Sequence, residues 1–221
     1  MKYCNEGNVE EAYNLLTDDC KDALYNSLEK FKAEYYDIVF SGEKLYVKEN
    51  WYTSGSYVTY RIDYTNNILA DGGLKEGQSF ADYITVIKKD DDSYGLNIGQ
   101  FIMKKDLNKT YEDDDIKVEV VSKQVFRMYE IYQINFTNKT ENGNNIYDDA
   151  KTKWYIVDKE DKSYDVAISE IPRSYLNLTP IIPSKVEAKF IKTYNPDKTI
   201  TKMVFKQLRV NDKYIEVELE M

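Results

Sequence analysis

The chain has 221 residues, of which 42% are apolar and 31% are charged, and its net charge is −9. It contains no histidine, which excludes histidine-based catalytic triads, cysteine–histidine dyads and ordinary zinc sites. The negative charge disfavours nucleic acid and anionic lipid as direct partners. The 21 tyrosines supply large amphipathic side chains, so the composition favours binding or assembly over catalysis and indicates no cofactor.

The first 42 residues carry helical signals. Residues 8–16 predict a short helix that Asn8 would cap, with Glu11 in the capping-box position. A second, longer helix begins after a cap at Thr17 or Asp18 and ends near 41–42. Its apolar residues recur every three or four positions and form one face: Cys20, Leu24, Leu28, Phe31, Tyr35 and Ile38.

After residue 42 the apolar period changes from helical to alternating. Four antiparallel strands are predicted at 45–52, 56–64, 80–90 and 94–102. The long helix and the sheet would each have one apolar side to bury, so we expect the helix to pack across the sheet. The prediction is an α+β domain over residues 1–103.

The second half predicts a different kind of domain. Residues 104–115 are charged and lack apolar periodicity, which indicates a linker. From 116 to 221 about seven short strands alternate with turn signals, which predicts an all-β sandwich. The proline-bearing segment 171–183 is expected to cross between its two sheets.

The sequence GNVEEAYNLLTDDCKDALYNSLEKFKAEYY at 7–36, followed by antiparallel strands, resembles a nuclear transport factor 2-like (cystatin-like α+β) domain. The resemblance covers residues 1–103. It implies a pocket between the helix and a curved sheet, where enzymes of that fold use carboxylates with tyrosine or histidine.

The second half resembles the immunoglobulin-like module of Gram-positive cell-surface lipoproteins and membrane-anchored proteins. The resemblance lies in INFTNKT at 134–140, WYIVDKEDKSYD at 154–165, the link at 180–183 and YNPDKTITKMVFKQLRV at 194–210. It implies an extracytoplasmic, clostridial-type envelope protein with a protein partner there. We expect a signal or membrane anchor upstream of Met1, because a helical pattern begins almost at once; any membrane contact would be through that anchor.

Two aspartates and three tyrosines are candidates for a ligand site in the first domain. Asp63 and Asp82 lie near Tyr60, Tyr64 and Tyr83 in the sequence. Carboxylates beside tyrosines can abstract and return protons without histidine, so a small-ligand binder or an isomerase or dehydratase is an alternative function. In the competing interpretation, the tyrosines fill the core and the aspartates face water.

Three aromatic residues are candidates for a partner-binding surface. Trp51, Tyr52 and Tyr57 flank the turn sequence TSGS at 53–56. Aromatic side chains dominate protein interfaces, so this strand tip could recognise a partner. They could instead cap the edge of the core.

No metal site is expected. The acidic runs 90–92 and 112–115, and the aspartates around the turn at 158–165, lack the spacing of a calcium-binding loop and are typical of solvated turns. Cys4 and Cys20 could pair in a disulfide or serve as small apolar residues.

These observations predict a non-enzymatic, extracytoplasmic binding or assembly module that acts through protein–protein contacts. The contacts would involve the open face of the first sheet or the sandwich edges. A small-ligand binder or enzyme and a structural spacer are the two alternatives.

Overall fold

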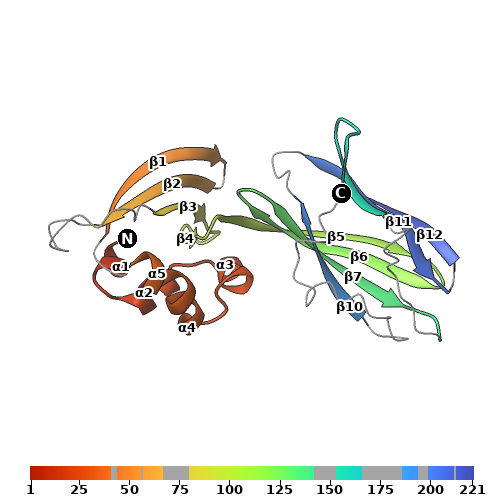
Figure 1. Cartoon of the computed structure of the whole chain (residues 1–221), viewed down its shortest axis with the longest axis horizontal. Helices are drawn as coiled ribbons and strands as arrows, with labels where there is room; N and C mark the ends of the chain where they lie inside the picture. The colour runs from red at the N-terminus through yellow and green to blue at the C-terminus, as the bar shows by residue number, and fades with distance from the viewer. Residues whose placement is uncertain are drawn as a thin grey trace. The chain divides into compact units, whose positions relative to one another are not determined.

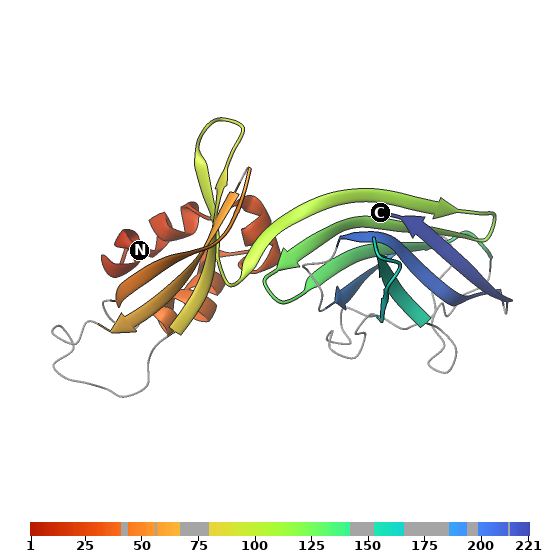
Figure 2. The same cartoon turned by 90° about the horizontal axis from the view of Figure 1, so that it is seen from above.

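The computed structural model describes residues 1–40, 44–55, 57–66, 80–141, 153–165, 186–193, 199–211 and 213–221. The chain divides into two compact units, residues 1–103 and 104–221 (Figures 1 and 2). The predicted crossover at 171–183 lies outside the described residues.

Unit 1 begins with short helical segments, none longer than six residues. They are α1 (Lys2–Asn5), α2 (Val9–Asn14), α3 (Asp18–Ala23), α4 (Leu28–Phe31), the π-helical turn η1 (Lys32–Tyr36) and α5 (Asp37–Val39). Within the described ranges, no helix is both long and apolar enough to cross a membrane.

The single long helix predicted from residue 18 to about 40 is therefore wrong. It breaks after Ala23 and restarts at Ser27, whose side chain caps α4 by accepting a hydrogen bond from the Lys30 amide at 3.2 Å. The π-helical turn then inserts an extra residue, which rotates all later side chains around the axis. As a result Val39 is buried, whereas Ile38, predicted on the apolar face, is 65% exposed.

The described residues form twelve strands in three antiparallel sheets. The strands of the first sheet are β1 (Lys44–Ser54), β2 (Tyr57–Asn66), β3 (Phe80–Lys88) and β4 (Tyr94–Asn97), in that order. The other strands are β5 (Phe101–Glu112), β6 (Ile116–Phe126), β7 (Glu130–Asn138), β8 (Lys153–Asp158), β9 (Ser163–Asp165), β10 (Val186–Thr193), β11 (Ile200–Val210) and β12 (Lys213–Glu220).

The predicted fold class, an α+β domain followed by an immunoglobulin-like sandwich, is wrong. The chain is mostly β: strands of up to 12 residues form three antiparallel sheets, and the helical part is reduced to segments of three to six residues. The apolar spacing of residues 18–38 suits one helix, but spacing alone does not reveal a capping serine or an inserted residue that interrupts it.

Unit 1 has an aromatic core. Phe31 and Tyr35 stack with ring centroids 5.8 Å apart, and Phe40 meets Tyr64 of β2 edge-on at 5.7 Å. Edge-on and offset stacked rings are the favoured geometries of aromatic pairs. Several of the tyrosines in the composition are thus core residues of this unit.

Unit 2 holds one core between two sheets, ordered β10-β7-β6-β5 and β12-β11-β8-β9. Phe136 of β7 and Phe205 of β11 lie edge-on at 5.7 Å, with Trp154 of β8 beside both. The predicted linker is incorrect over 104–112, because those residues belong to β5. That strand escaped prediction because its exposed positions are all polar, and only Leu107 and Tyr111 pack on the core.

Candidate functional site

Strands β2 and β3 separate the candidate ligand residues onto two faces. In their antiparallel register Ile62 lies opposite Asp82, and Arg61 lies opposite Tyr83. Successive side chains of a strand point to opposite sides, so Asp82 and Tyr83 cannot share a site. We call the face with Asp82 the inner face and the face with Tyr83 the outer face.

The remaining three candidates follow the same alternation. Tyr60 and Tyr64 belong to the inner face with Asp82, whereas Asp63 belongs to the outer face. Asp63 is held there by an ion pair with Arg61, whose Nη2 lies 3.0 Å from Oδ1. The five residues therefore do not form one site, and only Tyr64 and Asp82 join a common cluster.

On the inner face, the buried Asp82 carboxylate accepts four hydrogen bonds. Oδ2 accepts from the Tyr35 hydroxyl at 2.8 Å and the Gly99 amide at 3.1 Å. Oδ1 accepts from the amides of Tyr83 at 2.7 Å and Gln100 at 3.1 Å. Gly99 and Gln100 both have positive φ, which points their two amides at the carboxylate. Asp82 thus serves as the anchor of a backbone loop.

Burial dominates the protonation behaviour of this cluster. Desolvation raises the pKa of Asp82, although its hydrogen bonds from Tyr35 and the three amides oppose the rise. The pKa of Tyr35 is also raised by burial and by the negative charge of Asp82. Burial raises the pKa of the Cys20 thiol to about 12. Neither cysteine is in a disulfide, since Cys4 and Cys20 both carry free thiols.

A small cavity adjoins this cluster, between the helical segments and the inner face. Its volume is about 50 Å³, far below the roughly 300–1,000 Å³ of ordinary ligand pockets. The Tyr35 and Tyr64 hydroxyls lie 3.4 Å apart, and both residues line it. Further lining residues are Leu16, Phe31, Phe40 and Ile98. The aromatic core therefore fills most of the space in which the sequence placed a pocket.

On the outer face, a β-bulge brings two aromatic residues together. Asn50 pairs with Tyr60 and Tyr52 with Thr59, so Trp51 is an extra residue between them. Regular alternation would place Trp51 and Tyr52 on opposite faces, but a bulge re-aims one side chain. Both rings therefore lie on the outer face.

These two residues and two others form what we call the aromatic surface: Trp51, Tyr52, Tyr57 and Tyr83. Trp51 meets Tyr83 edge-on with centroids 5.2 Å apart, and Tyr52 lies 6.0 Å from Tyr57. Trp51 is 41% exposed and Tyr52 is 52% exposed. Beside them on the same face, Val47 is 69% exposed. Of the predicted partner residues, Trp51 and Tyr52 are thus together and accessible, and Tyr57 beside them is half-buried. Trp51 packs on Tyr83, which is buried and which the sequence had assigned to the ligand site.

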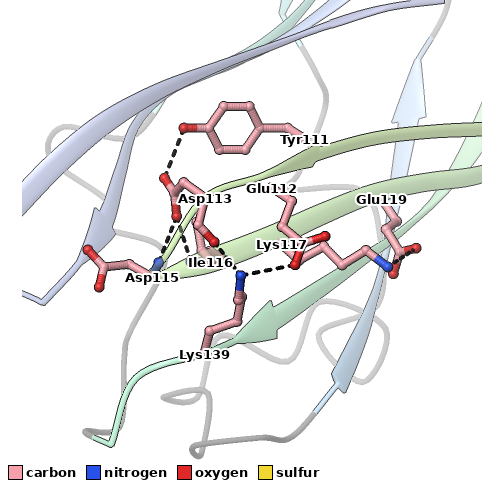
Figure 3. A network of polar contacts seen from close by, with 8 residues as sticks. All are labelled: Tyr111, Glu112, Asp113, Asp115, Ile116, Lys117, Glu119 and Lys139. Carbon is pink, nitrogen blue, oxygen red and sulfur yellow. Dashed lines mark hydrogen bonds and ion pairs between the residues drawn. The ribbon is translucent and has the colours of Figure 1, made fainter.

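Acidic residues of both runs form hydrogen bonds and ion pairs within or beside their own turns. At the turn between β5 and β6, the Asp113 carboxylate accepts hydrogen bonds from the amides of Asp115 and Ile116, both at 2.8 Å, and from the Tyr111 hydroxyl (Figure 3). Lys139 binds Glu112 at 2.9 Å. Asp91 likewise accepts from the Ser93 amide. Across the described ranges, no three histidine, cysteine or acidic side chains are grouped so as to hold a metal ion.

Sequence reasoning missed three features of these sites: Val47, the carboxylate-binding loop at 99–100, and the bulge. Only the Gly99 position carries a signal, since glycine favours positive φ. No family model, curated protein or solved structure matches the chain.

Proposed function

We propose that this chain is a non-enzymatic binding or assembly module that contacts a protein partner through the aromatic surface of unit 1. The observation that carries the proposal is the bulge in β1, which sets Trp51 and Tyr52 side by side and exposed on the outer face. Tryptophan and tyrosine are the residues most enriched at the energetic centres of protein interfaces.

The charges around the aromatic surface suit a protein partner. Arg61 and Asp63 neutralise each other at its margin, and Glu49 lies opposite Arg61 in the register. An apolar centre with a polar, nearly neutral margin is the usual anatomy of a protein interface. Neither a nucleic acid nor an anionic membrane would gain from this charge pattern.

The small-ligand alternative has less support. The cavity beside Tyr35 and Tyr64 holds about 50 Å³, and a drug-sized ligand needs several times that, roughly 300 Å³ or more. Asp82, the strongest candidate base, already accepts four hydrogen bonds from the protein. A base in that state has no free lone pair directed at a substrate.

The partner surface is tested by photo-crosslinking from Glu49, which is exposed on the outer face two residues before Trp51. The captured protein is purified, and its affinity is measured for wild type, Trp51→Ala and Tyr52→Ala. Tyr94→Ala is the control, because Tyr94 is 62% exposed but lies in β4. We expect each surface variant to bind roughly 30-fold more weakly, the ~2 kcal/mol of an interface hot spot, and the control to bind normally. Equal affinities for all four proteins would contradict the proposal.

An extracytoplasmic location belongs to the same proposal and rests on the resemblance of the second half to cell-surface modules. Protease treatment of intact cells of the source bacterium should degrade the protein. Protection until the cells are lysed would contradict this location while leaving the aromatic surface as a binding site.

A further inference from the structure

The two edges of the first sheet differ in how they are covered. At the β4 edge, the Thr17 amide donates to the Leu96 carbonyl at 3.0 Å, and the Leu96 amide donates to the Leu15 carbonyl at 2.9 Å. The opposite edge is β1 (Figures 1 and 2). In the part of the chain that the structure describes, no backbone group pairs with the outer side of β1.

The β1 edge is also unusual in its side chains. All of residues 46–53 are exposed, and four of them are hydrophobic: Tyr46, Val47, Trp51 and Tyr52. The edge strands β5 and β12, in contrast, expose mainly polar side chains. The exposed positions of β5 are Lys105, Asp106, Asn108, Thr110 and Glu112, and those of β12 are Lys213, Tyr214, Glu216, Glu218 and Glu220. A long edge with exposed apolar residues and few charges is a template for another strand.

We propose that β1 pairs antiparallel with β1 of a second copy of this chain, across a two-fold axis perpendicular to the sheet. The two four-stranded sheets become one continuous sheet. This pairing extends the proposed function, because Trp51 and Tyr52 lie on β1 itself. The biological role of the dimer rests on that proposed function. The dimer therefore presents two aromatic surfaces on the same side of one sheet.

The charges of β1 select the register. A perpendicular two-fold places one residue opposite its own copy, and like charges directly opposite destabilise a strand pair. Centring on Lys48 or Glu49 opposes two identical charges, and centring on Tyr46 opposes Lys48 with Lys44. Centring on Leu45 opposes no like charges but pairs only residues 44–46 of the strand, and beyond Glu49 the bulge interrupts the ladder.

Centring on Val47 avoids every like-charge pair in this strand. It buries the most exposed apolar side chain of β1 against its own copy, since Val47 is 69% exposed. It also places Lys48 opposite Tyr46 of the other copy, and lysine already stacks on a tyrosine here: Lys48 Nζ lies 4.5 Å from the Tyr60 ring centroid. The β1 edge is thus complementary to itself in this register.

The dimer is tested by sedimentation of the full chain over a range of concentrations. We expect wild type to reach twice the 26.0 kDa chain mass. Val47→Lys should remain monomeric, because it sets two ammonium groups against each other at the axis. Met128→Lys is the matched control, since Met128 is 54% exposed in unit 2 and should leave the dimer unchanged. A monomeric wild type, or a dimer that survives Val47→Lys, overturns the proposal.

Cysteine substitution tests the register. In a Cys4→Ser background, Val47→Cys should cross-link fully on mild oxidation, because opposed Cα atoms lie about 4.5–5.5 Å apart, within disulfide range. Glu49→Cys should not cross-link, since the two copies of residue 49 would be about 14 Å apart along the strands. Efficient cross-linking through residue 49 and not 47 overturns the assigned register.

Tyr57 separates this inference from the proposed function, because it belongs to the aromatic surface but lies on β2. If Tyr57→Ala keeps the dimer and loses the partner, both proposals hold. A wild-type chain that binds its partner as a monomer overturns the β1 pairing alone. A dimer whose partner affinity is unchanged by Tyr57→Ala, Trp51→Ala and Tyr52→Ala overturns the proposed function alone.

Discussion

At the scale of single residues, Asp82 shows how a buried carboxylate can be structural. Each of its oxygens accepts two hydrogen bonds, and three of the four donors are backbone amides. Breaking such a set costs stability because buried donors lose their acceptor. The sequence singled out Asp82 as a candidate ligand-binding residue, but its neighbours in sequence could not reveal that Gly99 and Gln100 surround it.

Asp82→Asn should therefore destabilise unit 1 strongly. An asparagine replaces one oxygen with an NH₂ group, which would face two donors of the protein. We expect a loss of about 2–4 kcal/mol in the free energy of unfolding, measured by urea denaturation. Asp63→Asn is the matched control, since Asp63 forms a solvent-accessible ion pair with Arg61, and it should behave like wild type. Equal stability of the two variants would contradict the anchoring role.

At the scale of secondary-structure elements, the turn between β5 and β6 depends on Asp113 (Figure 3). Burial opposes its ionisation, but hydrogen bonds from Ile116, Asp115 and Tyr111, together with Lys139, lower its pKa. A carboxylate with a lowered folded-state pKa contributes stability above its unfolded pKa, about 3.9 for aspartate, and that stability is lost as the pH falls through the folded value.

We expect Asp113→Ala to lose roughly 1 kcal/mol at neutral pH, because both turn amides lose their acceptor in a partly exposed site. Asp113→Asn should lose less, since both amides donate to Oδ1, which an amide oxygen can replace. The stability gap between wild type and Asp113→Asn should shrink as the pH is lowered below about 4 in urea titrations. A stability gap that stays constant with pH would show that the ionisation of Asp113 does not contribute to the stability of the fold.

The secondary-structure elements also show what the sequence could and could not predict. Strand segments such as 57–66 and 116–126 stand out because alternating apolar residues are a local signal. The helix was misjudged because Ser27 and the π-helical turn interrupt a regular spacing. Strand β5 was missed because a polar edge resembles a linker. Three of the four residues of the aromatic surface, Trp51, Tyr52 and Tyr57, were partner candidates in the sequence, but the shape of the surface depends on a bulge that only the strand pairing reveals.

At the scale of the whole molecule, the two units have separate cores, although the boundary between residues 103 and 104 falls within strand β5. Phe31 is buried in unit 1, and Phe136 is buried in unit 2. Each unit also contains one of the two tryptophans, Trp51 in unit 1 and Trp154 in unit 2. Single-tryptophan variants can therefore report the unfolding of each unit separately.

In a Trp154→Phe background, the fluorescence of Trp51 reports the unfolding of unit 1. There we expect Phe31→Ala to lower the free energy of unfolding by about 3–5 kcal/mol, the cost of the cavity that a truncated core aromatic leaves. In a Trp51→Phe background, the free energy of unfolding of unit 2, reported by Trp154, should be unaffected by Phe31→Ala. Phe136→Ala should do the reverse. Separate cores lose their packing energy separately, because a cavity affects the atoms that line it. If either substitution moves both tryptophan transitions together, the continuous strand β5 couples the units into a single cooperative fold.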